Sequence, residues 1–385
     1  MVADKLTVVQ LLPELEEGGV EGETLDLAIY LARKGYRSIV ISGGGRLVPQ
    51  LEQAGCTHIH WPHIGEKSPR CLQYIFKLRR FLLTEQVDIF HMRSRLPAWL
   101  GFLAWKLLPE TRRPSLITTF HGFHSVNSYS AIMAKGERVV AVSEIIKRHI
   151  IHNYKIAEEK VRLIYGGVDV EEFSPDNVTV DRLSSLRLKW LAGHEGKPVM
   201  ILPARFTQLK GQDILIEALA LIKERDFICL LIGDTNEKPE FTLKLRNRIT
   251  SHGLNDKILL VGHCSDMPAA LLLADFVISA SSTKPEAFGK IAIEAMAMGK
   301  PMIATAHGGS LETVVPGKTG WLVPPLDPKS MSCAIIEALS DLRSTERLGK
   351  QGRKWVVENF TTNIMYEKTV ALYCEAQRAK KETIN

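Results

Sequence analysis

Cysteine is scarce in this sequence, and no two cysteines are spaced as C-x-x-C. The six cysteines lie far apart, at positions 56, 71, 229, 264, 333 and 374. This spacing argues against a zinc site, an iron–sulfur cluster and a disulfide framework, and it fits a reducing cytoplasm. The sequence therefore predicts a protein that folds without cross-links.

Long apolar runs are also missing. The longest, Trp99 to Leu108, is interrupted by Lys106 and is shorter than the roughly 20 residues that a membrane-spanning helix needs. At the N-terminus, the short apolar run after Lys5 ends at Pro13 and Glu14, which does not fit a signal peptide. We expect a soluble or peripheral protein in the cytoplasm.

Several common functional patterns are absent. The glycines at 43–45 follow a predicted strand but lack the G-x-G-x-x-G spacing and the acidic partner of a nicotinamide site. No Ser/His/Asp or Cys/His set follows the predicted strands, so no nucleophile stands out. A D-x-D pair that could hold a metal ion is missing as well. No reading motif accompanies the basic residues, so we expect no nucleic-acid partner.

Length and periodicity predict two α/β domains. The 385 residues exceed the usual size of one domain, and the 45% hydrophobic content suffices for two cores. Short runs rich in Val and Ile alternate with helical segments, which indicates parallel sheets in doubly wound domains. The candidate strands are Leu6–Leu12, Tyr36–Ser42, His58–Trp61, Ile89–Met92, Leu116–Phe120, Val139–Val142 and Val161–Ile164 in the first half, and Val199–Ala204, Ile228–Ile232, Ile258–Val261, Phe276–Ser279, Met302–Thr305 and Trp321–Val323 in the second.

The positive charge is concentrated in one window. Residues 66–113 hold ten Lys/Arg and four Asp/Glu, and the other residues hold 39 of each sign, so this window carries the whole net charge of +6. Within it, Leu72–Leu83 is predicted to be a basic, strongly apolar helix. Such a helix can lie on an anionic membrane surface. It can equally pack on the core while its basic side chains reach water.

The most informative stretch is 285–301, which holds two glutamates eight residues apart. Apolar residues at helical spacing predict a helix that begins near Phe288 or Gly289. Glu286 would then lie on the loop before the helix, and Glu294 inside it. The helix N-terminus between them offers free N–H groups and a positive dipole end, which suits a phosphate. Two carboxylates beside an anion site can bind the hydroxyls of a sugar nucleotide.

A second pattern follows the strand predicted at Val199–Ala204. Arg205 and Lys210 come directly after it, and ligands of open α/β sheets bind beyond the carboxyl ends of the strands. Cations are disfavoured near a helix N-terminus, so two of them there suggest a bound anion. They suit the negative charge that builds up on a departing diphosphate.

These stretches resemble the retaining glycosyltransferases of family 4 (group 1), which have the GT-B fold. The stretch 285–301 resembles their E-x7-E signature, and Arg205 with Lys210 resembles their Arg…Lys-Gly element. The resemblance covers nearly the whole chain and is strongest from 198 to 324. It implies two doubly wound, Rossmann-like domains that face each other across a cleft, with a C-terminal helix that returns to the first domain.

The resemblance also implies domain borders. We predict an N-terminal, acceptor-side domain over residues 1–175, with the joint in the polar stretch that follows Gly167-Val168-Asp169. A C-terminal, nucleotide-sugar-binding domain would cover 176–360, and the returning helix 361–385. The family usually reads Pro-Asn where this chain has Tyr165-Gly166, which is a departure from its pattern.

Site residues follow from the resemblance, position by position. Glu286 would contact the donor sugar, Glu294 the ribose, and Arg205 and Lys210 the diphosphate. His121 would lie near the reacting sugar. The Gly-Gly loop at 18–19 would face the donor phosphate, the loop after Gly262-His263 would seat the base, and Gly308-Gly309 with Glu312 matches a further Gly-Gly-x-x-Glu element. The predicted donor-binding residues are Gly18, Gly19, Arg205, Lys210, Gly262, His263, Glu286, Phe288, Gly289, Lys290 and Glu294, and the predicted catalytic residues are Glu286, His121, Arg205 and Lys210.

The expected reaction moves a sugar from a UDP-, GDP- or ADP-sugar to an acceptor hydroxyl with retention, without a metal ion or cofactor. The stretches Ile89–Trp99 and Phe120–Gly122 resemble bacterial members that act on lipopolysaccharide core or related envelope glycans. We therefore expect a glycan or glycolipid acceptor, and contact of residues 66–113 with the anionic inner face of the inner membrane.

Two other kinds of protein remain open at this stage. One is a GT-B sugar-nucleotide epimerase or phosphorylase, although the chain is short for a phosphorylase. The other is a non-catalytic nucleotide-sugar-binding subunit that has kept the fold. The presence of Glu286, Glu294, Arg205 and Lys210 argues against a vestigial site.

Overall fold

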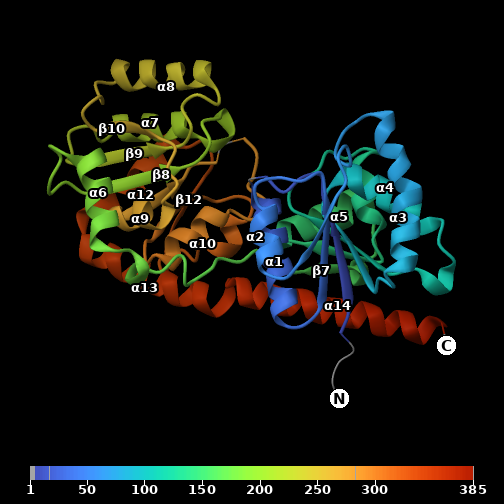
Figure 1. Cartoon of the computed structure of the whole chain (residues 1–385). Coiled ribbons are helices and arrows are strands. Elements are labelled where there is room, and N and C mark those ends of the chain that lie inside the picture. The colour runs from blue at the N-terminus through green and yellow to red at the C-terminus, as the bar shows by residue number, and fades with distance from the viewer. Residues whose placement is uncertain (1–4, 17, 282, 385) are drawn as a thin grey trace. The chain divides into compact units, whose positions relative to one another are not determined.

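The chain forms two compact units. The computed structural model describes residues 5–16, 18–281 and 283–384. The first unit contains the described residues up to Tyr165 and from Tyr366 onward, and the second unit contains Gly166–Met365 (Figure 1). Each unit is built on one parallel sheet that alternates with helices, as the sequence predicts.

The border between the units comes earlier in the chain than 175, and the second unit also keeps 361–365. Backbone hydrogen bonds explain this. The Val168 N–H donates to the Phe360 carbonyl at 2.9 Å, and the Thr362 N–H donates to the Val168 carbonyl at 3.0 Å. Gly167 packs on the same segment, since a Cβ there would lie 2.7 Å from Thr362 Cα. The two segments therefore belong to one body.

The first unit has a seven-stranded sheet in the order β3-β2-β1-β4-β5-β6-β7. Its strands are β1 (Thr7–Leu11), β2 (Arg37–Ser42), β3 (Thr57–His60), β4 (Ile89–Met92), β5 (Ser115–Phe120), β6 (Arg138–Ala141) and β7 (Val161–Leu163). Its helices are α1 (Gly19–Arg33), α2 (Val48–Gln53), α3 (Gln73–Thr84), α4 (Arg95–Lys106) and α5 (Glu144–Tyr154), with short 3-10 turns η1 (Pro69–Leu72), η2 (Glu110–Arg112), η3 (Ser130–Lys135) and η4 (Glu158–Lys160).

The second unit has a six-stranded sheet in the order β10-β9-β8-β11-β12-β13. Its strands are β8 (Val199–Pro203), β9 (Ile228–Ile232), β10 (Ile258–Gly262), β11 (Phe276–Ser279), β12 (Met302–Thr305) and β13 (Gly320–Val323). Its helices are α6 (Val180–Leu191), α7 (Gln212–Ala220), α8 (Pro239–Ser251), α9 (Met267–Leu273), α10 (Lys290–Ala297), α11 (Ser310–Thr313), α12 (Pro328–Ser340) and α13 (Leu342–Asn359), with the turns η5 (Pro175–Asn177) and η6 (Gln208–Lys210).

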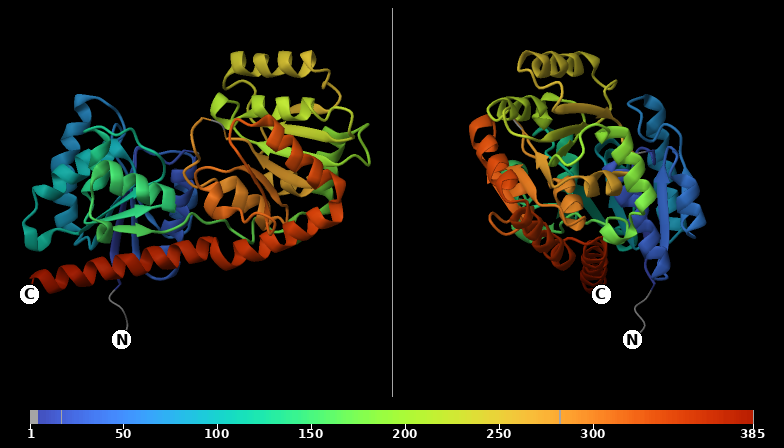
Figure 2. Two further views of the ribbon diagram at one scale, coloured as in Figure 1. Left: turned by 180° about the vertical axis from the view of Figure 1, so that it is seen from behind. Right: turned by 90° about the vertical axis from the view of Figure 1, so that its left-hand side faces the viewer.

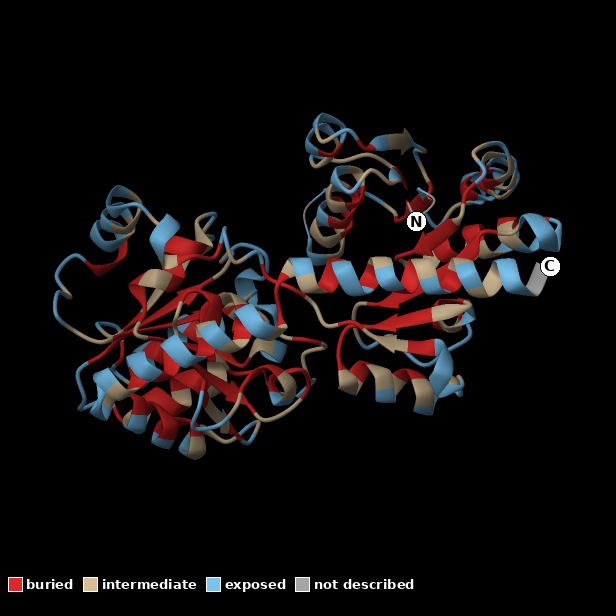
Figure 3. Ribbon diagram, turned by 90° about the horizontal axis from the view of Figure 1, so that it is seen from below, coloured by how far each residue is buried: buried red, intermediate tan, exposed pale blue. Residues whose placement is uncertain are grey.

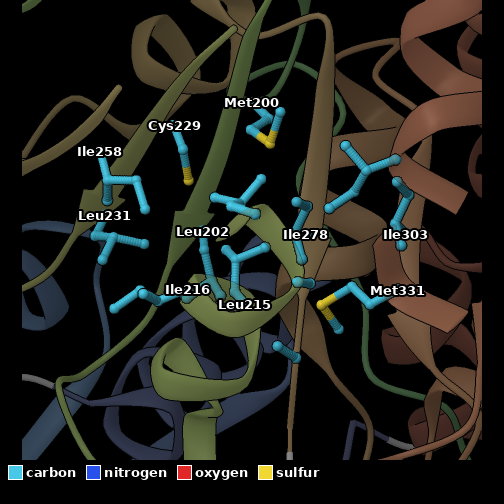
Figure 4. Close-up of a cluster of buried hydrophobic side chains, with 14 of the residues drawn as sticks. Met200, Leu202, Leu215, Ile216, Cys229, Leu231, Ile258, Ile278, Ile303 and Met331 are labelled. Atoms are coloured by element: carbon cyan, nitrogen blue, oxygen red, sulfur yellow. The ribbon is translucent and has the colours of Figure 1, made fainter. Parts of the chain in front are cut away.

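Every strand lies within one residue of its predicted bounds. The reason is burial on both faces. β4, β5 and β9 are buried along their whole length, so they read as continuous apolar runs. In Figure 3 the buried residues follow the strands and the inward faces of the helices, whereas the outward faces are exposed. The core of the second unit gathers side chains from β8, β9, β10 and α7, among them Met200, Leu231 and Ile216 (Figure 4).

The last helix, α14 (Thr362–Ile384), begins in the second unit, and its residues from Tyr366 onward belong to the first (Figure 2). Several polar contacts hold it there, of which three reach β4, β5 and the residue before β4. Tyr373 Oη lies 2.7 Å from Nδ1 of His91 on β4, Ser115 Oγ donates to the Ala376 carbonyl at 3.2 Å, and Gln377 Nε2 donates to Asp88 Oδ1 at 2.7 Å. The return of this helix to the first unit matches the sequence-based expectation.

The basic helix predicted at Leu72–Leu83 is α3, one residue further along the chain. Tyr74, Leu78 and Leu82 are buried and face the core, and α3 packs against α4. Phe76 on the same helix is 71% exposed, and Leu72 just before it is 53% exposed. The helix thus has a core face and, in addition, an exposed apolar side chain among basic residues. Nowhere in the described residues is a helix long and apolar enough to cross a membrane.

Candidate functional site

The sheet order of the second unit creates a switch point between β8 and β11. From β8 the chain continues to β9 on one side of the sheet, and from β11 it continues to β12 on the other. In open α/β sheets, ligands bind in the crevice beyond the carboxyl ends of the strands at this point. Arg205 follows β8, and Glu286 lies on the loop after β11. The two predicted elements therefore flank one crevice.

Glu286 and Lys210 contact each other at this edge. The Lys210 ammonium donates a hydrogen bond to Oε1 of Glu286, and Ser281 Oγ donates to the same oxygen at 2.8 Å. The side chains of Lys210 and Glu286 are 27% and 20% exposed, so the pair is largely shielded from water. The sequence predicts both residues in the site, and the structure brings them into direct contact.

The charge on Glu286 is set by these neighbours. Burial alone would raise the pKa of its carboxyl, but the Lys210 ammonium, together with Ser281 and His307, lowers the pKa below its usual range. His307 is held by a contact of 2.9 Å between its Nε2 and the Ser281 carbonyl. Glu286 is therefore ionised at neutral pH and can accept hydrogen bonds from hydroxyl groups.

Gly308 and Gly309 pack closely against the loop that carries Glu286. The Gly309 N–H donates to the Glu286 carbonyl at 3.0 Å. A Cβ on Gly308 would lie 2.3 Å from that carbonyl oxygen, and one on Gly309 would lie 2.2 Å from the Phe288 carbonyl oxygen. Only glycine fits this close approach. The two glycines thus fix the position of the Glu286 loop.

Helix α10 begins directly after this loop. Gly289, with a φ of 78°, is the residue before the helix, and no side chain caps the N-terminus. Because the first N–H groups of a helix have no partner within it, this end can bind an anion. Lys290, the first residue of α10, is 59% exposed and lies beside the same end. The predicted helix start is therefore confirmed to within one or two residues.

Glu294 lies one turn further into α10. Burial raises the pKa of its carboxyl, and nearby Glu172 adds to this, while Lys290, whose Nζ lies 3.7 Å from Oε1, opposes it. Its side chain is 16% exposed. A buried carboxyl with a raised pKa and one exposed lysine neighbour suits the binding of neutral hydroxyl groups.

A cavity of about 390 Å³ lies beyond β8, β9 and β10 and reaches α10. It brings together Arg205, His263 and Glu294, which the sequence predicts in one donor site. The residues that line it are Pro203, Ala204, Arg205, Ile232, Gly233, Asp234, Glu237, His263, Cys264, Met267, Ile291 and Glu294. A partly apolar wall with polar side chains that converge on the same cavity is typical of a small-molecule site.

The structure adds four polar residues that the sequence reasoning left out. Asp234 and Glu237 follow β9 and line the cavity, and Glu237 Oε1 lies 3.8 Å from Arg205 Nη1. Ser281 and His307 support Glu286, as described above. All four follow the carboxyl end of a strand, so the rule that places Arg205 and His121 could have found them.

Phe288 is predicted to bind the donor, and its side chain is buried. Its side chain is 8% exposed, and its ring centroid lies 5.9 Å from that of Phe360. A Cβ on Gly166 would lie 2.8 Å from the same ring. The ring therefore packs in the interior of the second unit. Its contribution to the site is to anchor the loop between Glu286 and Gly289.

Gly262 is the last residue of β10, and the other predicted residues lie in the first unit. Gly18 precedes α1, and Gly19 is the first residue of that helix. His121 follows β5 and has a side chain that is 14% exposed, with Nδ1 3.7 Å from Oε2 of Glu23. Burial lowers the pKa of His121 to about 4, which Glu23 opposes and which Arg93 and His124 reinforce. His121 is therefore neutral at physiological pH.

Comparisons with known proteins agree with this geometry. A family model described as glycosyl transferases group 1 matches residues 189–355, and one described as Glycosyltransferase Family 4 matches residues 17–172. The crystal structure of a glycosyltransferase from Rickettsia africae ESF-5 is 36% identical, with 97% of this chain and 99% of that chain covered and a TM-score of 0.89.

Two more distant relatives also span the chain. The N-acetyl-alpha-D-glucosaminyl L-malate synthase of Bacillus anthracis is 25% identical over 386 residues, 96% of each chain. The structure of Anabaena HepE in complex with UDP-glucose is 22% identical, with 95% of this chain and 99% of that chain covered and a TM-score of 0.79. With both family models matched and a relative of 36% identity along nearly its full length, this chain belongs to the group 1 glycosyltransferases of family 4 and has the GT-B fold.

Proposed function

We propose that the protein transfers a sugar from a nucleotide diphosphate donor to an acceptor hydroxyl, with retention at the anomeric carbon and without a metal ion. The observation that carries this proposal is the contact between Lys210 and Glu286 beside the free N-terminus of α10. One cation, one carboxylate and one helix end meet there, which matches the leaving diphosphate and the sugar of such a donor.

The chemistry of each part of the donor suggests which residues bind it. The diphosphate lies against Lys210, Arg205 and the first N–H groups of α10, which stabilise its growing negative charge. The hydroxyls of the sugar bind Glu286, and those of the ribose bind Glu294. The base enters the cavity near His263, at the end of β10. HepE, which is similar in fold, was crystallised with UDP-glucose, which supports a nucleotide-sugar donor.

The transfer step needs no protein nucleophile. The bond between the anomeric carbon and the diphosphate oxygen breaks, and the acceptor oxygen forms its bond on the same face of the sugar. The acceptor proton passes to the leaving phosphate oxygen. Glu286 orients the sugar in this scheme, and Lys210 and Arg205 stabilise the diphosphate as it leaves.

For the acceptor we propose an envelope glycan or glycolipid. The support is the basic window 66–113 together with the exposed Phe76 on α3, which fits contact with an anionic lipid surface. A lipid-linked acceptor would then be presented at the inner face of the inner membrane, beside the enzyme.

A ligand screen followed by a transfer assay tests the proposal. UDP, GDP, ADP and their sugars are compared by thermal shift, because a ligand that binds the native state raises the melting temperature. The donor that binds is then incubated with and without an envelope glycolipid extract, and the anomeric configuration of the product is read by NMR. Retained configuration in an acceptor-dependent product supports the proposal. Conversion of the donor without acceptor indicates an epimerase, and binding without turnover on any extract indicates a binding subunit.

A further inference from the structure

In the first unit, a buried polar network surrounds His121. Arg93, the residue after β4, is 3% exposed, and its Nη2 lies 2.5 Å from Oε1 of Glu23 on α1. The second oxygen of Glu23, Oε2, lies 3.7 Å from Nδ1 of His121. Gln10 on β1 is fully buried and accepts a hydrogen bond from Arg93 Nη1 at 3.3 Å. One carboxylate thus lies between a buried cation and an imidazole.

This arrangement makes the two ring nitrogens of His121 different. Nδ1 faces the Glu23 carboxylate, whereas Nε2 is buried and has no hydrogen-bond partner among the described residues. At 3.7 Å the contact is longer than a hydrogen bond, so Glu23 acts on Nδ1 through its charge. A proton on Nδ1 is favoured by that charge, and a proton on Nε2 would be buried without an acceptor.

The ionisation of the network fits a neutral ring. His121 has a pKa of about 4, so near neutral pH it carries one proton and one free lone pair. The charged and titratable groups around it are Glu23 on α1, Arg93 after β4, His124 on its own loop and His91 on β4. His91 already uses both nitrogens, toward Tyr373 and Thr119.

We propose that Glu23 is a positioning residue, which holds the His121 proton on Nδ1 and so leaves Nε2 to accept a hydrogen bond from a hydroxyl group of the sugar substrate. Arg93 pairs with the other oxygen of the same carboxylate. The proposal rests on the proposed transferase function for the identity of that hydroxyl. A purely structural role for Glu23, as the counter-charge of Arg93, predicts no preference between the two nitrogens.

The tautomer can be measured directly. Protein labelled with ¹⁵N-histidine is examined by NMR near neutral pH, and the His121 signals are assigned with His121→Asn. We expect a protonated Nδ1 and an unprotonated Nε2 in the native protein. Because Glu23→Ala alone leaves Arg93 as a buried unpaired charge, the main variant is Glu23→Ala with Arg93→Met, and Arg93→Met alone is its matched control. The double variant should show a mixture of tautomers, whereas Arg93→Met should keep the native one.

Kinetics adds a second readout. With His121 present, the double variant should have a kcat at least about tenfold lower than that of Arg93→Met. A loss of this kind is expected when a carboxylate that sets a histidine tautomer is removed. When His121→Asn is also present, adding Glu23→Ala to Arg93→Met should not change kcat. A proton found on Nε2 in the native protein, or equal losses of kcat with and without His121, overturns the proposal. The tautomer does not depend on turnover, so failure of the transferase function would show separately, as native protein without transfer activity.

Discussion

Lys210 and Glu286, which are 76 positions apart in the chain, form an ion pair at the carboxyl edge of the second unit's sheet. Each charge has the other as a partner. In our proposal, the oxygens of a diphosphate would compete with Glu286 for the Lys210 ammonium, and sugar hydroxyls would replace the ammonium at Glu286. Donor binding would then exchange one set of partners for another, and neither charge would be left buried alone.

Loss of either partner should abolish most of the transfer activity. Lys210→Ala removes a cation from the diphosphate, and Glu286→Ala removes the carboxylate that orients the sugar. We expect kcat to fall by about 10²–10³ for each, the range seen when one preorganised electrostatic group is removed. Lys350→Ala is the control, because Lys350 is an exposed residue of α13 that pairs with Glu346 on the same helix. Transfer rates are compared after circular dichroism has shown that each variant is folded. Near-normal rates in both variants would exclude this assignment.

The Glu286 loop should be sensitive to a single methyl group on Gly308. Gly308 and Gly317 both have a positive φ, 66° and 70°, so alanine costs about 1–2 kcal/mol of backbone strain at either position. Only at Gly308 does the new Cβ approach another group, the Glu286 carbonyl oxygen at 2.3 Å, since nothing lies within 4 Å at Gly317. Melting temperatures of the two variants should drop, and transfer should fall at least about tenfold more in Gly308→Ala. Equal activity of Gly308→Ala and Gly317→Ala would show that transfer does not depend on the position of the Glu286 loop.

Stability should depend on pH through His121. Its folded pKa of about 4 lies below its ordinary value of 6.5, so the unfolded chain binds more protons between these values. The stabilisation by the neutral ring is thus complete above about pH 6.5 and is lost as the pH falls toward 4. At about pH 5 the loss amounts to roughly 2 kcal/mol.

Urea unfolding near pH 7 and near pH 5 checks this. The drop in unfolding free energy between the two pH values should be smaller by that amount in His121→Asn than in the native protein. His152→Asn, at an exposed position of α5 in the same unit, should leave the drop unchanged. A pH dependence that is the same in native protein and His121→Asn would contradict the lowered pKa.

Chelation should not affect transfer. In our proposal Arg205, Lys210 and the N-terminus of α10 carry the diphosphate charge, so EDTA should change neither kcat nor KM. Arg205→Ala should instead lower kcat, but less than Lys210→Ala does, since the Arg205 guanidinium is 74% exposed and water screens its charge. Initial rates with EDTA and after addition of Mg²⁺ or Mn²⁺ decide the point. A loss of activity with EDTA that metal restores would require a different account of the diphosphate.

The exposed face of α3 should bind anionic lipid. We expect the protein to float with phosphatidylglycerol vesicles at low salt and to bind them less at high salt. It should not bind neutral phosphatidylcholine vesicles. Phe76→Ser should weaken binding roughly tenfold or more, because burying a phenylalanine is worth about 1.5–3 kcal/mol. Leu243→Ser, at a 57% exposed position of α8 in the second unit, is the control. Equal flotation of the two variants would argue against α3 as the contact.

Much of the fold and part of the site could be predicted from the sequence, for a physical reason. Strands buried on both faces leave continuous Val and Ile runs, and strand ends are where ligands bind, so Arg205 and Glu286 could be placed before any coordinates. Pairings between distant segments leave no local pattern. The packing of Phe288 on Phe360, and the binding of Val168 to Phe360 and Thr362 that moves the domain border, depend on tertiary contacts alone.

The same limit applies to the network around His121. A glutamate within a helix and an arginine after a strand are each unremarkable in sequence. Only the fold shows that Glu23 and Arg93 meet beside His121.

The path of α14 has a consequence for how the chain is made. Because the first unit is built from segments before and after the second unit, it cannot be completed until α14 has been synthesised. His91 and Ser115 can form their hydrogen bonds to Tyr373 and Ala376 only after α14 has emerged. The second unit, continuous from 166 to 365, can close first. A chain cut short after Met365 would therefore contain the whole second unit, and its first unit would have an uncovered face where α14 packs.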